Sequence, residues 1–232
     1  MKWAYLYTGG VKMKLTYLGH SAFEILINDS KILIDPFLIC YPNYDYSGTT
    51  SIFLTHGHGD HLGSAIEISK RTGAKITAIY ELANYCSSQK SNAEGIGLGN
   101  WLEYSWGKVI FLPAFHSSSL PDGEYMGCPA GILFDIEGKK IFHAGDTCLN
   151  SEMKVLKEIF KPDIAILPIG GTFTMDVEQA SIAADWIGAK TVIPMHYNTF
   201  DAISADVNKF AKLIADQDKH AEIMSVKNSI DI

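Results

Sequence analysis

Basic residues are scarce in this chain, and arginine is almost absent. Among 232 residues there are 19 Lys or Arg and 26 Asp or Glu, so the formal net charge is −7 at pH 7. Arg71 is the single arginine, and it lies near the end of a predicted helix, where a solvated cation complements the helix dipole. Because nucleic-acid surfaces need clustered Lys and Arg, this composition argues against a nucleic-acid partner.

Long apolar runs and paired cysteines are also missing. No apolar stretch approaches the ~20 residues that a membrane helix needs, and residues 1–11 show no clear cleavage site of a secretory signal. The four cysteines, Cys40, Cys86, Cys128 and Cys148, form no C-x-x-C pair. This spacing indicates neither a disulfide framework nor a thiolate zinc site. We therefore expect a cytoplasmic protein with reduced thiols and no membrane contact.

No linker, internal repeat or low-complexity segment interrupts the chain. With 47% hydrophobic residues, a chain of this length can bury a sizeable core. We therefore expect one domain over residues 1–232. Met13-Lys14-Leu15 resembles an alternative start, so residues 1–12 are interpreted as an N-terminal extension. The sequence is also compatible with a homo-oligomer.

Alternating apolar residues and turn signals predict the elements of secondary structure. Strands are expected at residues 14–18, 22–27, 31–34, 52–54, 75–79, 108–113, 130–135, 140–144, 163–167 and 191–194. Helices are expected over 64–72 and 81–90, from Ser151, from Asp176, and over 203–214. Gly95, Gly97 and Gly99 are interpreted as a turn-rich connection. Strands followed by a helix-bearing section, repeated in the second half, favour two sheets packed face to face with helices outside.

The densest chemical signal is the stretch Thr55-His56-Gly57-His58-Gly59-Asp60-His61. It follows the apolar run 52–54, so a glycine-containing loop places three imidazoles and a carboxylate at the end of a buried strand. Gly57 and Gly59 allow a tight turn, through which side chains two residues apart can converge. Imidazole and carboxylate are the usual protein ligands of zinc, manganese and iron. The stretch therefore predicts a metal site.

Three other predicted strands end in residues of the same kind. His116, Asp146 and His196 each follow an apolar run. Because the ends of neighbouring strands lie side by side, these residues can complete a second half of the metal site. Of the other histidines, His143 is expected to pack facing away from Asp146, and His220 is expected to be solvated.

The order of these residues resembles the metallo-β-lactamase superfamily over essentially the whole chain. Finer motifs are similar to a group of metal-dependent hydrolases related to ascorbate-6-phosphate lactonase. These motifs are Leu18-Gly19-His20-Ser21, Ile34-Asp35-Pro36, His116-Ser117-Ser118-Ser119, His143-Ala144-Gly145-Asp146-Thr147, Pro168-Ile169-Gly170-Gly171 and His196-Tyr197-Asn198-Thr199-Phe200. The resemblance implies an α/β (α+β) protein, a four-layer αβ/βα sandwich with its site at the edge of the sheets.

The resemblance also implies two divalent metal ions, with zinc expected and manganese as the alternative. The implied ligands are His56, His58 and His116 for the first ion, Asp60, His61 and His196 for the second, and Asp146 as a bridge between them. Asp60, Asp146 and His196 are at the same time the expected catalytic residues. His58 occupies the position at which diiron oxygen-reducing relatives have glutamate, so its imidazole favours hydrolysis over redox chemistry.

Residues that flank the ligands are the candidates for holding the substrate: Ser117, Gly171, Tyr197, Asn198 and His20. For His20, a buried hydrogen-bonded role is the alternative. Asp35 is expected to accept a hydrogen bond from a ligand imidazole and so fix its tautomer; a strand-end cap is the alternative.

We expect a hydrolase that uses a metal-bridged hydroxide to cleave a small anionic ester, either a phosphodiester or a lactone. One alternative is a catalytically silent metal-binding protein on the same fold, although this chain lacks none of the ligands. A second alternative is an RNA-processing nuclease of the superfamily, against which the net charge of −7 argues.

Overall fold

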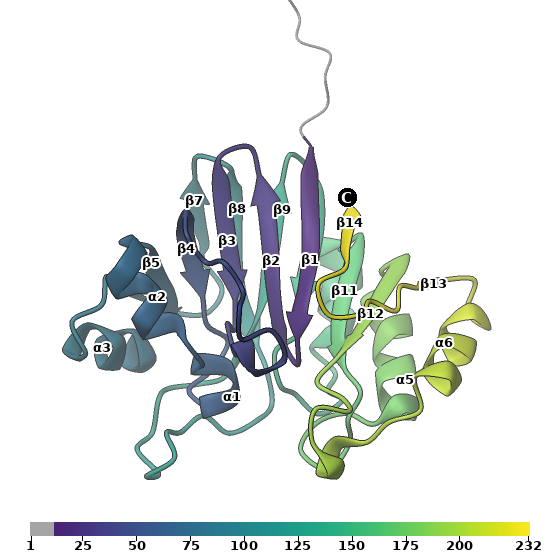
Figure 1. The fold of residues 1–232 in the computed structure, drawn as a ribbon. Helices are drawn as coiled ribbons and strands as arrows, with labels where there is room; N and C mark the ends of the chain where they lie inside the picture. Colours follow the sequence, from purple (N-terminus) through teal and green to yellow (C-terminus); the bar gives the residue numbers. More distant parts are fainter. Residues whose placement is uncertain (1–11) are drawn as a thin grey trace, which may run out of the picture.

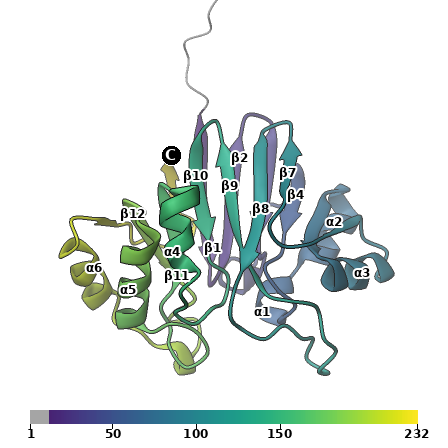
Figure 2. The ribbon, with the colours of Figure 1, turned by 180° about the vertical axis from the view of Figure 1, so that it is seen from behind.

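The polypeptide forms two seven-stranded β-sheets that face each other, with helices on the outer side of each (Figures 1 and 2). This computed structural model describes residues 12–232. The interpretation of residues 1–12 as an N-terminal extension therefore lies, except for Lys12, outside the described residues. The expected four-layer αβ/βα sandwich is confirmed.

The first sheet has the strand order β14-β1-β2-β3-β4-β5-β6. In chain order its strands are β1 (Met13–Gly19), β2 (Ala22–Ile27), β3 (Ser30–Ile34), β4 (Thr49–Phe53), β5 (Lys75–Ile79), β6 (Ala93–Ile96) and β14 (Ser229–Asp231). Neighbours from β14 to β3 are antiparallel, and those from β3 to β6 are parallel. Helices α2 (Ala65–Thr72) and α3 (Tyr80–Ser88) pack on the parallel part.

The second sheet has the order β13-β12-β11-β10-β9-β8-β7. Its strands are β7 (Trp101–Tyr104), β8 (Gly107–Pro113), β9 (Ala130–Ile136), β10 (Lys139–His143), β11 (Ile164–Pro168), β12 (Thr191–Met195) and β13 (His220–Ala221). Here β7 to β10 are antiparallel and β10 to β13 parallel. Helices α5 (Val177–Ile187) and α6 (Val207–Ala215) pack beside β11 and β13. The short elements are α1 (Gly59–Leu62), α4 (Met153–Val155), a π-helical turn (Leu156–Phe160) and 3₁₀ turns at Leu38–Cys40 and Asp201–Ile203.

The period of two along the strands divides the apolar side chains between two cores. In β4, Phe53 points between the sheets and Ile52 points outward beneath α2. The Phe53 ring lies 5.2 Å from that of Phe134 and 6.4 Å from that of Phe111, both on the opposite sheet. Packing of both faces explains why the strands read as nearly continuous apolar runs. The close fit of the two sheets fixes the relative position of their strand ends.

Most predicted elements are confirmed, and the differences have local causes. The capping box of Asp176 and Gln179 opens α5 as expected. The interpretation of Gly95 as part of a turn-rich connection is wrong, because Gly95 lies within β6 and packs closely on Tyr80. Ile203 belongs to a 3₁₀ turn, and α6 begins only after Asp206, whose carboxylate caps it.

The short edge strands β6, β7, β13 and β14 were not predicted at all. Each has two to four residues, too few for a periodic pattern. No helix within residues 12–232 combines the length and the apolar character needed to cross a bilayer. The four cysteines of the described part of the chain are all free.

Candidate metal centre

Strand direction brings the candidate ligands to one edge of the sandwich. Strands β1, β3 and β4 run the same way in the first sheet, and β8, β10 and β12 run the same way in the second. Their C-terminal ends lead into His20, Asp35, His56, His116, Asp146 and His196. The ends that carry the His-rich loop and α1 lie at the lower end of the sandwich in Figure 1. Residues more than a hundred positions apart therefore meet there.

The first ligand group consists of three imidazoles. One ring nitrogen from each of His56, His58 and His116 lies within 4.8 Å of the others. His56 Nε2 is 3.0 Å from His58 Nδ1, while His56 Nδ1 lies 3.0 Å from Thr55 Oγ1. The contact with Thr55 turns the opposite nitrogen of His56 toward the group. Three converging imidazole nitrogens form a typical half-site for a divalent transition metal.

The second ligand group adds a carboxylate. Asp60, His61 and His196, together with His20, place one ligand atom each within 4.8 Å of one another. The ring of His61 is fixed from behind, because its Nδ1–H donates to Asp35 Oδ2 at 2.7 Å. Its Nε2 therefore faces inward, where it lies 3.3 Å from Asp146 Oδ1. Asp35 is buried and has the position expected of a residue that fixes a ligand tautomer.

Asp146 lies between the two groups. Its Oδ2 is 3.1 Å from His196 Nε2 in the second group and 3.6 Å from His116 Nε2 in the first. Only 3% of the residue is exposed. The carboxylate is therefore placed to contact cations in both groups.

The electrostatics of the centre favour ionised carboxylates beside the imidazoles. Burial opposes ionisation of Asp146, but His61 and His196 hold its pKa well below the ordinary value. Burial lowers the pKa of His56 well below its ordinary value. Burial lowers the pKa of His196 as well, but hydrogen bonds to Asp146 and Asp60 outweigh this effect and raise the pKa to about 9. A divalent cation would displace the proton that the carboxylates stabilise on an imidazole such as that of His196, so metal binding would release protons.

Two buried atoms at the middle of the cluster lack hydrogen-bond partners. They are His61 Nε2 and Asp146 Oδ1. Buried polar atoms are almost always satisfied in folded proteins, and an exception often marks an ion position. Here the unsatisfied atoms are a nitrogen and an oxygen that face each other, which are donors suited to zinc or manganese. The residues present therefore fit a divalent metal.

The backbone around the centre is unusual. His20, Asp35 and His196 have positive φ angles of 56°, 43° and 53°, a left-handed conformation that is uncommon outside glycine. Such conformations persist only where the surroundings impose them, and they gather at functional sites. At Gly170 a side chain would overlap the carbonyl oxygen of His196. The glycine therefore allows the His196 backbone to approach β11 closely.

A cavity of about 250 Å³ opens onto the ligands. It is lined by His58, Asp60, His116, Ser117, Asp146, Phe173 and His196. Ser117 is a predicted substrate contact, and its Oγ lies 3.3 Å from His58 Nε2. Phe173 was not predicted. It is 59% exposed. The one sequence feature that could have indicated its place in the cavity is an aromatic residue in the loop between a glycine pair and a helix cap.

The other four predicted substrate contacts do not line this cavity. Gly171 lines a neighbouring hollow instead. The Asn198 side chain bonds the backbone of Ala205 through both its oxygen and its nitrogen. Tyr197 packs against the core, and His20 is only 1% exposed.

Three further residues lie as the sequence indicates. His143 faces away from the ligands, with its Nε2–H donating to Ser21 O at 2.9 Å. His220 is exposed beside Glu222. Arg71 is exposed and pairs with Glu67 one turn earlier at 3.0 Å.

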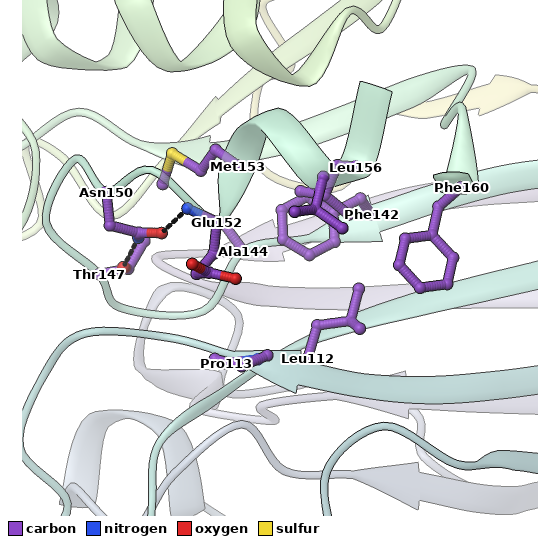
Figure 3. Close-up of a pocket in the computed structure, with 11 residues that line it drawn as sticks. Leu112, Pro113, Phe142, Ala144, Thr147, Asn150, Glu152, Met153, Leu156 and Phe160 are labelled. Carbon is purple, nitrogen blue, oxygen red and sulfur yellow. Dashed lines mark hydrogen bonds between the residues drawn. The ribbon is translucent and has the colours of Figure 1, made fainter. Parts of the chain in front are cut away.

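A second, apolar cavity of about 50 Å³ lies against the outer face of the second sheet (Figure 3). Leu112, Phe142 and Leu156 line it beneath α4 and the π-helical turn. Asn150 at its edge donates to Thr147 Oγ1, which also accepts from the N–H of Phe115. Most of its lining is apolar, and none of the described residues that line it is a histidine. Its polar edge supports the strand end that carries Asp146.

Both the sequence and the fold are similar to those of known proteins. The model of the β-lactamase superfamily domain matches residues 14–196. A protein of Geobacillus thermodenitrificans named UPF0173 metal-dependent hydrolase is 46% identical over 210 residues, which cover 87% of this chain and 93% of the relative. A Bacillus cereus protein of the same name is 47% identical over 209 residues, which cover 86% of this chain and 92% of the relative. The solved structure of Igni18, described as a novel metallo hydrolase from Ignicoccus hospitalis, has a TM-score of 0.86 and 34% identity and covers 95% of this chain and 98% of its own.

Two glycines of the His-rich loop provide a test of how the loop is held. A Cβ at Gly57 would overlap the Met126 side chain, whereas a Cβ at Gly59 meets nothing within 4 Å. The N–H of Gly57 also donates to Ser118 Oγ at 3.1 Å. We expect Gly57→Ala to lower the free energy of unfolding by about 1–3 kcal/mol through overpacking, and to lower the metal content. Gly59→Ala should change stability by less than ~0.5 kcal/mol.

Denaturant unfolding and elemental analysis of the two variants check this prediction. Equal behaviour of Gly57→Ala and Gly59→Ala in both measurements would contradict it.

Proposed function

The chain belongs to the β-lactamase superfamily, among its metal-dependent hydrolases, and on this premise we propose that it hydrolyses a small anionic ester at a centre of two divalent metal ions. The substrate is a phosphodiester or a lactone. The observation that carries the proposal is the pair of ligand groups that meet at Asp146, which lies within 3.6 Å of imidazoles from both.

We assign His56, His58 and His116 to the first ion, and Asp60, His61 and His196 to the second. Two ions held there would lower the pKa of a water molecule toward 7 and would stabilise the negative charge that develops during ester cleavage. No nucleophilic serine or cysteine is then required. The high proportion of imidazole ligands favours zinc, with manganese as the alternative.

Asp60 is the more exposed of the two carboxylates that line the cavity. Its side chain is 31% exposed, against 3% for Asp146. Asp60 Oδ2 lies 3.1 Å from His20 Nε2 and 3.6 Å from His196 Nε2, which leaves Oδ1 for the second ion or for the proton of the attacking water. Asp60 is therefore the proposed acid–base residue, while His196 acts as a ligand of the second ion and Asp146 holds the two halves together; these three are the proposed catalytic residues.

The cavity lining supports the proposed substrate class. None of the seven described lining residues is Lys or Arg, and Phe173 adds an apolar surface. Sites specific for phosphate monoesters often use an arginine fork to hold a dianion. Without a fixed cation, the cavity should hold a singly charged diester or a lactone better than the dianionic group of a phosphate monoester. The hydroxyl of Ser117 and the metal ions meet the substrate's charge.

We propose a single hydrolase domain, because both ligand groups draw residues from both sheets. Free cysteines in the described chain favour the cytoplasm. A homo-oligomer is compatible with this assignment.

Metal analysis followed by a substrate screen tests the proposal. After reconstitution with zinc or manganese, elemental analysis should find close to two ions per chain, and the loaded protein should hydrolyse members of a panel of phosphodiesters and lactones. A reproducible ceiling of one ion would contradict the two-ion centre. Two ions without turnover across the panel would indicate a silent metal-binding protein.

Asp146→Ala provides the matching variant. Because its carboxylate balances charge in both groups, its loss should abolish turnover and weaken both ions. Cys148→Ala is the control, since this exposed thiol lies only two residues away. It should keep both ions and full activity. Similar losses in the two variants would show that the bridge is assigned wrongly.

Variants of Arg71 and Ser117 distinguish substrate binding by an arginine from substrate binding by a hydroxyl in the cavity. Arg71→Ala should change kcat/KM by less than about threefold, under ~1 kcal/mol, because its guanidinium is paired with Glu67 outside the cavity. Ser117→Ala should lower kcat/KM about tenfold, the scale of one lost hydrogen bond. Steady-state kinetics on the best panel substrate measures both. A crippling effect of Arg71→Ala beside a silent Ser117→Ala would refute this model of substrate binding.

A further inference from the structure

His20 uses both of its ring nitrogens for contacts inside the protein. Its Nε2 lies 3.1 Å from Asp60 Oδ2, and its Nδ1 lies 3.0 Å from Thr199 Oγ1. The ring is enclosed by Phe37 and Phe200, each with its centroid 5.6 Å away. Because the residue is buried, no ring atom is free to meet a substrate in the cavity.

The chemistry of the partners fixes the direction of these hydrogen bonds. An ionised carboxylate only accepts, so His20 Nε2 must carry the proton that it donates to Asp60. In the neutral ring Nδ1 is then the acceptor, and the Thr199 hydroxyl donates to it. A protonated ring nitrogen cannot bind a cation. His20 therefore holds Asp60 and is not itself a metal ligand, although it lies among the second ligand group.

The backbone of His20 makes a second connection to the same group. Its carbonyl oxygen accepts from the N–H of His196 at 2.9 Å and from the hydroxyl of Tyr17 at 3.1 Å. Both His20 and His196 have left-handed backbones, so this hydrogen bond joins two conformations that neither residue would adopt readily alone. One residue thus contacts a ligand from each sheet.

Thr199 is itself held in place. It lies in the loop after His196, where the N–H of Asn198 donates to Ile203 O at 2.9 Å. The Asn198 side chain accepts from the N–H of Ala205 at 2.9 Å. These contacts give Asn198, a predicted substrate residue, a structural role: they fix the loop that presents the Thr199 hydroxyl to His20.

We propose that His20 is a positioning residue for the second metal ion, with its ring held in place by the Thr199 hydroxyl, its Nε2–H holding Asp60 and its carbonyl holding His196. This inference rests on the proposed two-ion centre. Hydrogen bonds that orient metal ligands from behind typically change metal affinity by roughly 10- to 100-fold when they are removed.

Thr199→Val and Thr199→Ser form the test pair. Valine keeps the shape of threonine without the hydroxyl, and serine keeps the hydroxyl. Zinc is titrated into the chelator-treated full-length protein in competition with a chromophoric chelator, which resolves two dissociation constants. We expect Thr199→Val to weaken the second ion by roughly 10-fold or more and the first by less than about threefold. Thr199→Ser should bind both ions as the wild type does.

A double-mutant cycle shows whether Thr199 acts through His20. Asparagine tolerates a left-handed backbone, so His20→Asn preserves the turn while removing the ring. In this background, Thr199→Val should have no further effect on the second ion, because its hydrogen-bond partner is already gone. Thermal unfolding of each apoprotein shows whether the variants are equally folded.

The outcomes are distinct. Equal second-ion affinity in Thr199→Val and Thr199→Ser overturns the role of Thr199 and His20, as does an additive effect in the double mutant. A wild-type protein that binds fewer than two ions contradicts the proposed function instead, before any variant is compared.

Discussion

The candidate centre depends on one buried contact, in which the carboxylate of Asp35 accepts three hydrogen bonds. Thr55 donates to it through its N–H at 2.8 Å and its hydroxyl at 2.6 Å, and His61 donates through Nδ1–H at 2.7 Å. A buried carboxylate is costly unless it is fully hydrogen-bonded, and here the bonds tie the end of β3 to the start of the His-rich loop. Thr55 in turn contacts His56. A single carboxylate thus positions the residues that the first sheet contributes to both ligand groups.

The second constraint is the packing of the two sheets. His56, His58, Asp60 and His61 follow a strand of the first sheet, whereas His116, Asp146 and His196 follow strands of the second. Neither sheet holds all the residues of either ligand group. The side chains that pack around Phe53 therefore set the separation of the ligands as well as the stability of the fold. Metal binding should reinforce the same packing, because an ion that binds only the folded state stabilises it.

Much of the centre could be predicted from the sequence because its residues follow strongly apolar strands. The ends of β4, β8, β10 and β12 are visible as breaks in apolar runs, and their His and Asp residues meet in the structure as expected. The residues around the substrate cavity were harder to predict. His20 and Phe173 differ in burial, at 1% and 59% exposed, yet each lies one or two residues after a glycine. Only the packing of loops from separate strands decides which of the two reaches the cavity, and no local pattern carries that information.

Anomalous diffraction from crystals of the zinc-reconstituted protein tests the central claim most directly. Two peaks about 3.5–4 Å apart are expected, one about 2.0–2.2 Å from nitrogens of His56, His58 and His116, and one at that distance from Asp60, His61 and His196. Asp146 should contact both. A single peak, or a second peak away from Asp60, His61 and His196, would contradict the two-ion centre.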